Sequence, residues 1–405
     1  MRFKMYCLMI VMAVAVAANG ADEISKADIS VPADCQNVKF RGSLENSRIV
    51  FERTGKGHVA FMGGSITEMD GYRPMVCEIL KKRFPKTNFK FTNAGIASTC
   101  STTGAFRLEE QVLSQGPVDL FFVEFSVNDD QDAHHSRREC IRGLEGIIRH
   151  VLAHNPNADI VVTSFVNEAM LKDFAAGKET VSSASHEEVA QHYQIPRIAL
   201  NREVSERIQE GKLTWKQFGG VHPGPTGNQL CANMIDRLLD QSWKGALPKG
   251  AVMKPHLLPG AMDEYSYAKG HFVDFAKVKI VSGWKLEKPE WSKLPGSHRP
   301  RWDNDILLCA TEPGAELELK FQGTAVGIYL LAGPDAGILD AKIDNDPVKS
   351  FDLLHGYSAD LHYPRSIIFN VDLTQGQHVL TLKLSNSKND KSKGTAARIL
   401  KFCVN

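Results

Sequence analysis

The sequence has no strong charge imbalance. Its 405 residues include 48 Lys and Arg against 47 Asp and Glu, which gives a formal net charge of +1. A protein that binds nucleic acid or an anionic membrane through its electrostatic field normally carries an excess of basic residues. The composition therefore predicts no nucleic-acid partner.

Long hydrophobic runs are also missing. The run from Leu8 to Val16 is too short to span a bilayer, and no later stretch is long enough. It follows Arg2 and Lys4 and precedes the small-residue segment Ala18-Asn19-Gly20, which is the arrangement of a secretory signal peptide. We therefore predict that residues 1–20 are a signal peptide, that the protein is secreted or periplasmic, and that it has no membrane span.

Cysteines are few and show no metal-binding spacing. Eight are present, and seven, an odd number, remain after residue 20. No Cys-x-x-Cys or Cys/His spacing indicates a zinc site. Cys77, Cys140 and Cys231 fall in helical patterns and are expected to be small buried side chains. A disulfide between Cys309 and Cys403 is an alternative that the spacing neither supports nor excludes.

Apolar strands alternate with amphipathic helices over residues 58–243. The predicted strands are His58–Met62, Asn88–Asn93, Val118–Ser126, Asp159–Val166 and a shorter one at Arg197–Leu200. The predicted helices are Tyr72–Phe84, Thr102–Ser114, His135–His154, Ser185–Gln194 and Thr226–Trp243. This alternation predicts a parallel sheet covered on both faces, with functional groups beyond the carboxyl ends of its strands. Residues 21–57 show no clear pattern and are expected to be a lead-in that packs against this domain.

The pattern changes after residue 243. Residues 244–270 are rich in proline and glycine and are expected to be a linker. Over residues 271–405 apolar residues alternate with period two, and the predicted strands are Ala315–Gln322, Thr324–Leu331, Ala341–Asp344, Ser366–Val371, His378–Leu384 and Ala397–Val404. Short strands without helices indicate a β-sandwich.

Three tryptophans of this region could stack on sugar rings, although such residues more often fill a core: Trp284, Trp291 and Trp302. His362-Tyr363-Pro364-Arg365 could be a loop that faces the other domain.

Four short polar stretches fall at the predicted strand ends or in loops of the first domain: Gly63-Gly64-Ser65-Ile66-Thr67, Asn93-Ala94-Gly95-Ile96-Ala97, Ser126-Val127-Asn128-Asp129 and Val221-His222-Pro223-Gly224. A serine on a tight turn between a strand and a helix exposes its hydroxyl, and a nearby histidine can accept its proton. A tetrahedral intermediate also needs N–H donors for its oxyanion. The backbone N–H groups of Ser65 and Gly95 and the side-chain amide of Asn128 are donors of the right type.

Each of these residues also has an ordinary structural interpretation. Ser65 could be a helix N-cap. Asn128 could cap the helix predicted from His135, and His222 could be a surface turn residue. The acidic residues after Asn128 could hold a metal ion, but a solvated loop explains them more simply: Asp129, Asp130 and Asp132. Glu124, in the third predicted strand, needs a partner if it is buried, and Arg73 is a candidate on spacing alone.

The four stretches, in this order, resemble the SGNH hydrolase family, which contains the GDSL-like esterases and lipases. The resemblance covers about residues 58–243 and implies a flavodoxin-like, three-layer α/β domain that hydrolyses esters through an acyl-serine. It implies that Ser65 is the nucleophile and His222 the general base. It also implies an oxyanion hole made by Ser65, Gly95 and Asn128, with no cofactor and no metal.

The sequence departs from the usual family pattern at two positions. GGSIT replaces the more usual GDS and resembles the branch that contains many carbohydrate esterases; the attached sandwich, expected to be jelly-roll-like, resembles deacetylases of plant or algal polysaccharides. The family usually places an Asp three residues before the histidine, where this chain has Gly219. We predict a Ser65–His222 dyad in which a carbonyl of Gly219 or Gly220 accepts the second imidazole proton. Glu68 or an acid from the C-terminal domain is the alternative, and Gly219→Asp is expected to keep or raise activity if the site has triad-type geometry.

Together these observations predict a secreted serine esterase that removes O-acetyl groups from a polysaccharide or oligosaccharide. Its expected partner is thus an acetylated carbohydrate. A lipase or lysophospholipase is a second hypothesis, although the sequence shows no long apolar lid. A carbohydrate-binding protein that has lost activity is a third, and the missing Asp is its main support. The sequence gives no indication of the oligomeric state.

Overall fold

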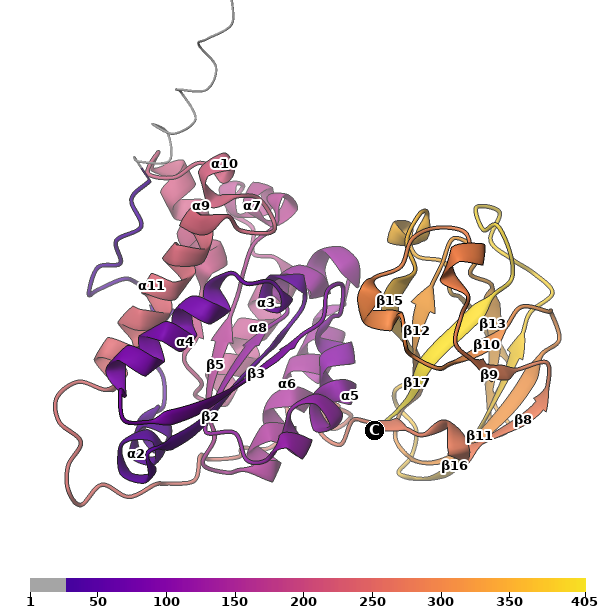
Figure 1. The fold of residues 1–405 in the computed structure, drawn as a ribbon, viewed down its shortest axis with the longest axis horizontal. Helices are drawn as coiled ribbons and strands as arrows, with labels where there is room; N and C mark the ends of the chain where they lie inside the picture. Colours follow the sequence, from indigo (N-terminus) through magenta and orange to yellow (C-terminus); the bar gives the residue numbers. More distant parts are fainter. Residues whose placement is uncertain (1–26) are drawn as a thin grey trace, which may run out of the picture.

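The computed structural model describes residues 27–405, which form an α/β part and a β-sandwich lying side by side (Figure 1). The predicted signal peptide, residues 1–20, lies outside the described residues. In Figure 1 the α/β part runs from indigo to pink, and the sandwich from orange to yellow. The C-terminus lies near the junction, close to α5 (Ser101–Gln111).

A six-stranded sheet forms the centre of the α/β part, with the order β1-β6-β5-β4-β2-β3. Its strands are β1 (Val38–Lys39), β2 (Lys56–Gly63), β3 (Asn88–Gly95), β4 (Leu120–Glu124), β5 (Asp159–Thr163) and β6 (Arg197–Ile198). Strands β2 to β6 are parallel, and β1 is antiparallel to β6. The parallel strands have the flavodoxin-like order 2-1-3-4-5. The predicted fold class is confirmed, with one antiparallel edge strand that we did not predict.

Helices cover both faces of this sheet. Besides α5, they are α2 (Glu45–Thr54), α3 (Ser65–Glu68), α4 (Tyr72–Arg83), α6 (Arg137–His154), α7 (Glu168–Ala175), α8 (Val181–His192), α9 (Leu200–Gln209), α10 (Trp215–Phe218) and α11 (Pro225–Ser242). Ala60 and Met62 of β2 pack with residues of α5, α6 and α8. Val59 and Phe61 pack on the other face, with residues of α2, α4 and α11. Because alternate residues of β2 point to opposite faces of the sheet, this strand contributes to a hydrophobic layer on each side.

Two segments of the α/β part differ from the predicted elements. Helix α2 and strand β1 lie in the lead-in, where no pattern was visible. The apolar residues of α2 form one run around Phe51 rather than a 3.6-residue repeat, which explains why the helix was missed. The predicted strand Arg197–Leu200 stops at Ile198, and α9 begins at Leu200.

The C-terminal part consists of two antiparallel sheets packed face to face, with orders β15-β12-β17-β10-β9 and β14-β13-β16-β11-β8, and β7 pairing with β17. The strands are β7 (His271–Val273), β8 (Val278–Ser282), β9 (Lys285–Glu287), β10 (Leu307–Ala310), β11 (Glu316–Gly323), β12 (Val326–Ala332), β13 (Ile338–Ile343), β14 (Lys349–Asp352), β15 (Tyr363–Asn370), β16 (Gly376–Leu384) and β17 (Ala397–Val404). Alternate residues of both sheets form its core, as Leu317, Leu319 and Phe321 of β11 show. The predicted sandwich is confirmed.

Aromatic and thiol side chains of the sandwich are mostly internal. Trp284 and Trp302 are buried, so neither offers an exposed ring face to a sugar.

All seven cysteines of residues 27–405 are unpaired. Cys309 of β10 lies opposite Arg398 of β17, five residues before Cys403. This offset is roughly 17 Å along the strand, too far for a disulfide between Cys309 and Cys403.

The two parts share a hydrophobic core. Phe106 of α5 packs against Tyr267, with ring centroids 4.9 Å apart, and the same cluster includes Trp302 and Tyr329 of the sandwich. The predicted linker, residues 244–270, packs along the α/β part: His256 Nε2 lies 2.8 Å from Asp159 Oδ1. This continuous packing fixes the sandwich against the helices that flank the sheet.

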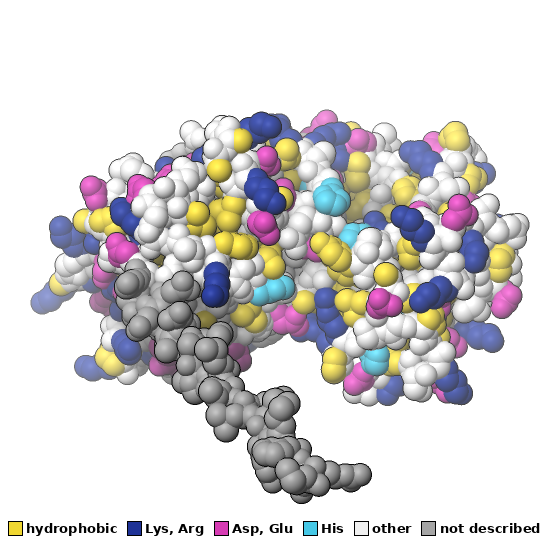
Figure 2. All heavy atoms as spheres, turned by 90° about the horizontal axis from the view of Figure 1, so that it is seen from above, with side chains coloured by type: hydrophobic (Ala, Val, Ile, Leu, Met, Phe, Trp, Pro, Cys, Tyr) yellow, Lys and Arg dark blue, Asp and Glu magenta, His cyan; other side chains and the backbone are white. Residues whose placement is uncertain are grey.

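Within residues 27–405, no helix combines the length and apolarity needed to cross a membrane. On the face shown in Figure 2, Lys and Arg side chains are interspersed with Asp and Glu. This distribution agrees with the near-zero net charge of the sequence.

Candidate active site

The carboxyl ends of three neighbouring strands meet where the strand order of the α/β sheet reverses. Gly63 ends β2, and Ser65 begins α3 two residues later. Gly95 ends the adjacent strand β3, and Asn128 follows β4 on the other side of β2. Ligands of open α/β sheets bind at such a reversal. His222 lies in the loop between α10 and α11.

His222 and Ser65 form a direct contact. The Nε2 atom of His222 lies 2.8 Å from Ser65 Oγ, and both residues are at least partly exposed. An imidazole in this position can accept the hydroxyl proton and leave a nucleophilic oxygen. Ser65 is the first residue of α3, whose N-cap is Gly64 and has no side-chain cap bond. The alternative interpretation of Ser65 as an N-cap is therefore wrong.

The Asn128 amide lies against the backbone just before Ser65. A Cβ atom on Gly64 would be 1.9 Å from Asn128 Oδ1 and 3.0 Å from Nδ2. Asn128 Nδ2 donates a 2.6 Å hydrogen bond to Asp132 Oδ2. A carboxylate only accepts, so this bond sets the amide orientation and leaves the second N–H of Nδ2 for another acceptor. Asn128 does not cap α6, because Ser136 accepts the N–H of Glu139 there.

Gly95 is close to the nucleophile, but its N–H is already bonded. It donates to Asn93 Oδ1 at 2.9 Å. A Cβ atom at Gly95 would be 2.2 Å from Glu68 N, so the glycine lets α3 approach β3 closely. Among the described residues, none accepts a hydrogen bond from the Ser65 N–H. The structure therefore leaves the Ser65 N–H and one N–H of Asn128 Nδ2 without an acceptor within residues 27–405, whereas the Gly95 N–H is already bonded.

The second nitrogen of His222 has no acceptor in residues 27–405, neither a carbonyl of Gly219 or Gly220 nor a carboxylate. The Glu68 carboxylate instead accepts the Ala97 N–H at 2.8 Å and pairs with Arg301 at 3.0 Å. Neither of the two partners that we expected is therefore in place for the His222 Nδ1 atom.

Gly219 has a structural reason to be glycine. Its φ is +102°, its N–H bonds to Trp215 O as α10 ends, and a Cβ atom would be 2.0 Å from Gly224 N. An aspartate at this position would collide with backbone atoms in a conformation that L side chains rarely adopt. This geometry argues against the expectation that Gly219→Asp keeps or raises activity, which stays a prediction for experiment.

Asp129 is a buried residue rather than part of a solvated loop. It accepts the Ser101 N–H at 2.8 Å, contacts His186 Nε2 at 2.9 Å and lies 3.4 Å from His135 Nδ1. Burial alone would lower the pKa of His135, but the Asp129 carboxylate raises it well above its usual value. Donor atoms of Cys100, Asp129 and His135 lie within 4.8 Å of one another and could hold a metal ion. The ion pair of Asp129 with His135 accounts for the same arrangement without one.

Glu124 is buried at the end of β4 without a charged partner. Its Oε1 atom accepts from Ser126 N and Oγ, both at 3.1 Å, while Oε2 has no hydrogen-bond donor. Burial raises the pKa of Glu124 to about 7. Arg73, which we expected to pair with it, instead bonds to Asp70 at 2.7 Å and to the carbonyl of Thr67.

Comparison with known proteins agrees with this geometry. Residues 61–230 match the model of the GDSL-like Lipase/Acylhydrolase family. This segment lies in the α/β part and contains Ser65, Gly95, Asn128 and His222. A search of curated proteins found no matching relative.

Solved structures share the two-part architecture of the chain. A two-domain esterase (CEX) active on acetylated mannans, co-crystallised with mannopentaose, is 20% identical and superposes with a TM-score of 0.72. The match covers 91% of this chain and 97% of that chain. A second structure of such an esterase gives the same values. At this identity the likeness establishes the fold alone, including the placement of a sandwich beside the α/β part.

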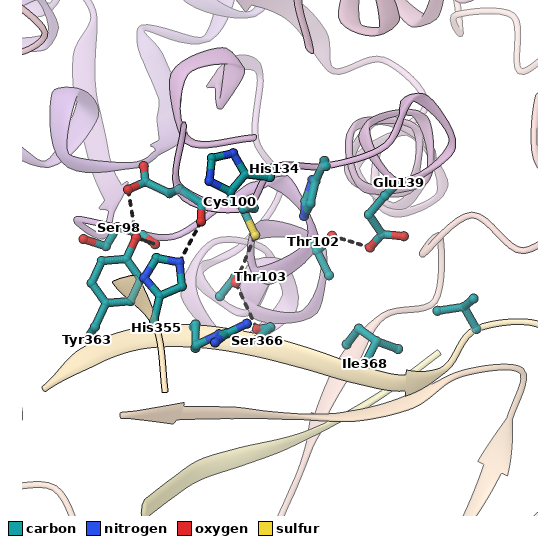
Figure 3. Close-up of a pocket in the computed structure, with 15 residues that line it drawn as sticks. Ser98, Cys100, Thr102, Thr103, His134, Glu139, His355, Tyr363, Ser366 and Ile368 are labelled. Carbon is teal, nitrogen blue, oxygen red and sulfur yellow. Dashed lines mark hydrogen bonds between the residues drawn. The ribbon is translucent and has the colours of Figure 1, made fainter. Parts of the chain in front are cut away.

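A cavity of about 350 Å³ lies at the junction of the α/β part and the sandwich. Figure 3 shows its walls: Ser98, His134 and Glu139 come from the α/β part, and His355, Tyr363 and Ser366 from the sandwich. Tyr363 faces the other domain, which we considered for this stretch without support from the sequence, but it does so from strand β15 rather than from a loop.

The sandwich also holds the loop that follows Gly95. Arg299 Nη1 donates to the carbonyl of Ala97 at 3.0 Å, and its Nη2 donates to Ser98 Oγ at 2.8 Å. Ser98 has a φ of +68°, which is uncommon for a residue other than glycine. These contacts were not predictable from the sequence, because Arg299 lies about two hundred residues from the loop and outside every motif.

Proposed function

We propose that this protein is a secreted or periplasmic serine esterase that removes O-acetyl groups from a polysaccharide or oligosaccharide. The observation that carries the proposal is the 2.8 Å contact between His222 Nε2 and Ser65 Oγ in a GDSL-like acylhydrolase domain. The carbohydrate substrate is supported by the two-part fold, which the chain shares over 91% of its length with an esterase active on acetylated mannans.

In the proposed reaction, Ser65 Oγ attacks the acetyl carbonyl while His222 Nε2 takes its proton. The resulting oxyanion accepts hydrogen bonds from the Ser65 N–H and the free N–H of Asn128 Nδ2, with Gly95 N–H as a third donor that is shared with Asn93. The C–O bond to the sugar then breaks, and His222 returns the proton to the departing hydroxyl. Water attacks the acetyl-serine by the same route and releases acetate.

The imidazolium of this site is stabilised less than in a triad. An aspartate on Nδ1 would fix the tautomer and balance the positive charge. His222 is exposed, so water can accept a hydrogen bond from its Nδ1–H group. We therefore propose a Ser65–His222 dyad, in which most of the rate enhancement comes from the nucleophile, the base and the oxyanion donors.

Acetate release from acetylated mannan and acetylated xylan, together with p-nitrophenyl acetate turnover, tests the proposal. Ser65→Ala should abolish turnover without unfolding the protein, and Ser350→Ala, an exposed serine of β14, should leave it unchanged. Mannan binding with no turnover of any ester would favour the inactive carbohydrate-binding protein. Preferential cleavage of phospholipids or long-chain esters would favour the lipase.

A further inference from the structure

Asp132 connects the sandwich to the Asn128 amide. Its Oδ2 atom accepts from Asn128 Nδ2 at 2.6 Å, and its Oδ1 atom accepts from the Tyr363 hydroxyl at 2.8 Å. Its backbone carbonyl accepts from His355 Nε2 at 2.9 Å. Figure 3 shows Tyr363 and His355 together on the sandwich side of the cavity. Two of these three donors to Asp132, Tyr363 and His355, thus come from the sandwich.

We propose that Tyr363 is a positioning residue of the oxyanion hole, acting through Asp132 on the Asn128 amide. The inference rests on the proposed function of Asn128 as an oxyanion donor. On this inference the sandwich helps to build the active site, in addition to any contact that it makes with substrate.

The geometry gives a physical reason for this role. Asn128 Oδ1 is buried and has no donor, so the bond to Asp132 is what holds the amide in its orientation. A buried carboxylate needs donors on both oxygens, and Tyr363 supplies the one on Oδ1. The Tyr363 ring is itself fixed, because it stacks on His355 with centroids 4.4 Å apart and 8° between the planes.

The protonation states of Tyr363 and Asp132 are consistent with the hydrogen bonds from Tyr363 to Asp132 and from Asn128 to Asp132. Burial raises the pKa of Tyr363, and the neighbouring Asp132 raises it further, so the phenol stays a donor. Burial also raises the pKa of Asp132, while the bonds from Tyr363 and Asn128 lower it. Without the Tyr363 hydroxyl, Asp132 would take up a proton at higher pH and hold the amide through a weaker, neutral bond.

Tyr363→Phe in the full-length protein keeps the ring and removes only the hydroxyl. With p-nitrophenyl acetate as substrate, we expect kcat to fall about tenfold, as for one hydrogen bond to a charged group, with KM within twofold. The loss should increase toward acid pH. In an Asn128→Ala background the same substitution should change kcat by less than twofold, because no amide remains to be positioned.

Ser366→Ala is the matched control. Ser366 lies on the same strand and contacts Thr103 Oγ1 across the same junction at 2.9 Å, but no hydrogen bond joins it to Asp132. It should retain the wild-type kcat. Asp132→Asn is a second variant, which should lower kcat, and adding Tyr363→Phe to it should lower kcat by less than twofold more.

Wild-type kcat in Tyr363→Phe would overturn the inference. So would an equal loss in the Asn128→Ala background, or the same loss in Ser366→Ala, either of which would show a merely structural role. These outcomes are distinct from failure of the proposed function, in which the wild-type protein would release no acetate or Ser65→Ala would stay active.

Discussion

The side-chain amide of Asn128 occupies the space that a Cβ atom on Gly64 would need, since that atom would be 1.9 Å from Asn128 Oδ1. The two residues belong to different motif stretches and follow different strands, β2 and β4. Their contact explains why position 64 is a glycine. A side chain at position 64 would push the amide away from its present position.

Gly64→Ala should therefore lower kcat without unfolding the protein. The atoms that must move belong to the end of one side chain, so the fold can adapt at small cost. That side chain is the proposed oxyanion donor, and displacing it should cost about 10²–10³ in kcat. Turnover of p-nitrophenyl acetate and the midpoint of thermal unfolding measure the two effects. Gly250→Ala, where a Cβ atom would meet nothing within 4 Å, is the control.

No residue in 27–405 accepts a hydrogen bond from His222 Nδ1. Replacing a carboxylate should therefore lower kcat less than replacing His222 does. His222→Ala should lower kcat by about 10²–10⁴, the usual range for a general base. Glu68→Gln should cost less than tenfold, because its carboxylate bonds to Ala97 and Arg301 instead of the imidazole. A loss in Glu68→Gln as large as that in His222→Ala would contradict the dyad and identify a triad acid.

Gly219→Asp should reduce both stability and activity. The aspartate would need the positive φ of +102° and a Cβ position 2.0 Å from Gly224 N, in the loop that carries His222. Strain of this kind costs about 1–3 kcal/mol, and relieving it would displace the histidine. Gly219→Ala separates the effects, since it adds the same Cβ atom without the carboxylate. Higher turnover in the aspartate variant than in the wild type would show that the loop adapts and that a triad acid can be restored.

The sequence predicted the parts of the fold in which burial sets a regular pattern. Strand β2 is apolar because both faces are covered, and α6 and α11 repeat every 3.6 residues because one side of each is buried. Ser65 and His222 were predicted from residue types at strand ends and in loops, since the carboxyl ends of parallel strands converge.

Contacts that depend on side-chain directions across the fold were not predictable. Tyr363 and Asp132 are 231 residues apart, and nothing in the sequence pairs them. The glycine at 219 was read as a lost acid, but its dihedral angle and the nearby Gly224 backbone show a steric requirement. Asp129 looked like part of an exposed acidic run, because the two histidines that surround it come from separate segments.

Glu124 should make the stability of this protein fall with rising pH. Burial raises the pKa of its carboxyl from 4.5 to about 7, and no cation offsets the charge. Between these two pH values the folded state binds more protons than the unfolded state, so the free energy of unfolding decreases as pH rises. Below the lower value both states are protonated and the group makes no difference.

Glu124→Gln removes this titration while keeping an oxygen that can accept from Ser126 N and Oγ. The difference in unfolding free energy between the variant and the wild type should be constant below about pH 4.5 and then rise, by about 3 kcal/mol, until it levels off above about pH 7. Any unfavourable placement of the amide shifts this curve by a constant and leaves its shape unchanged. Denaturant unfolding at several pH values measures it. A flat difference would show that Glu124 titrates at its ordinary pKa, and a falling one would require a cationic partner in the folded protein.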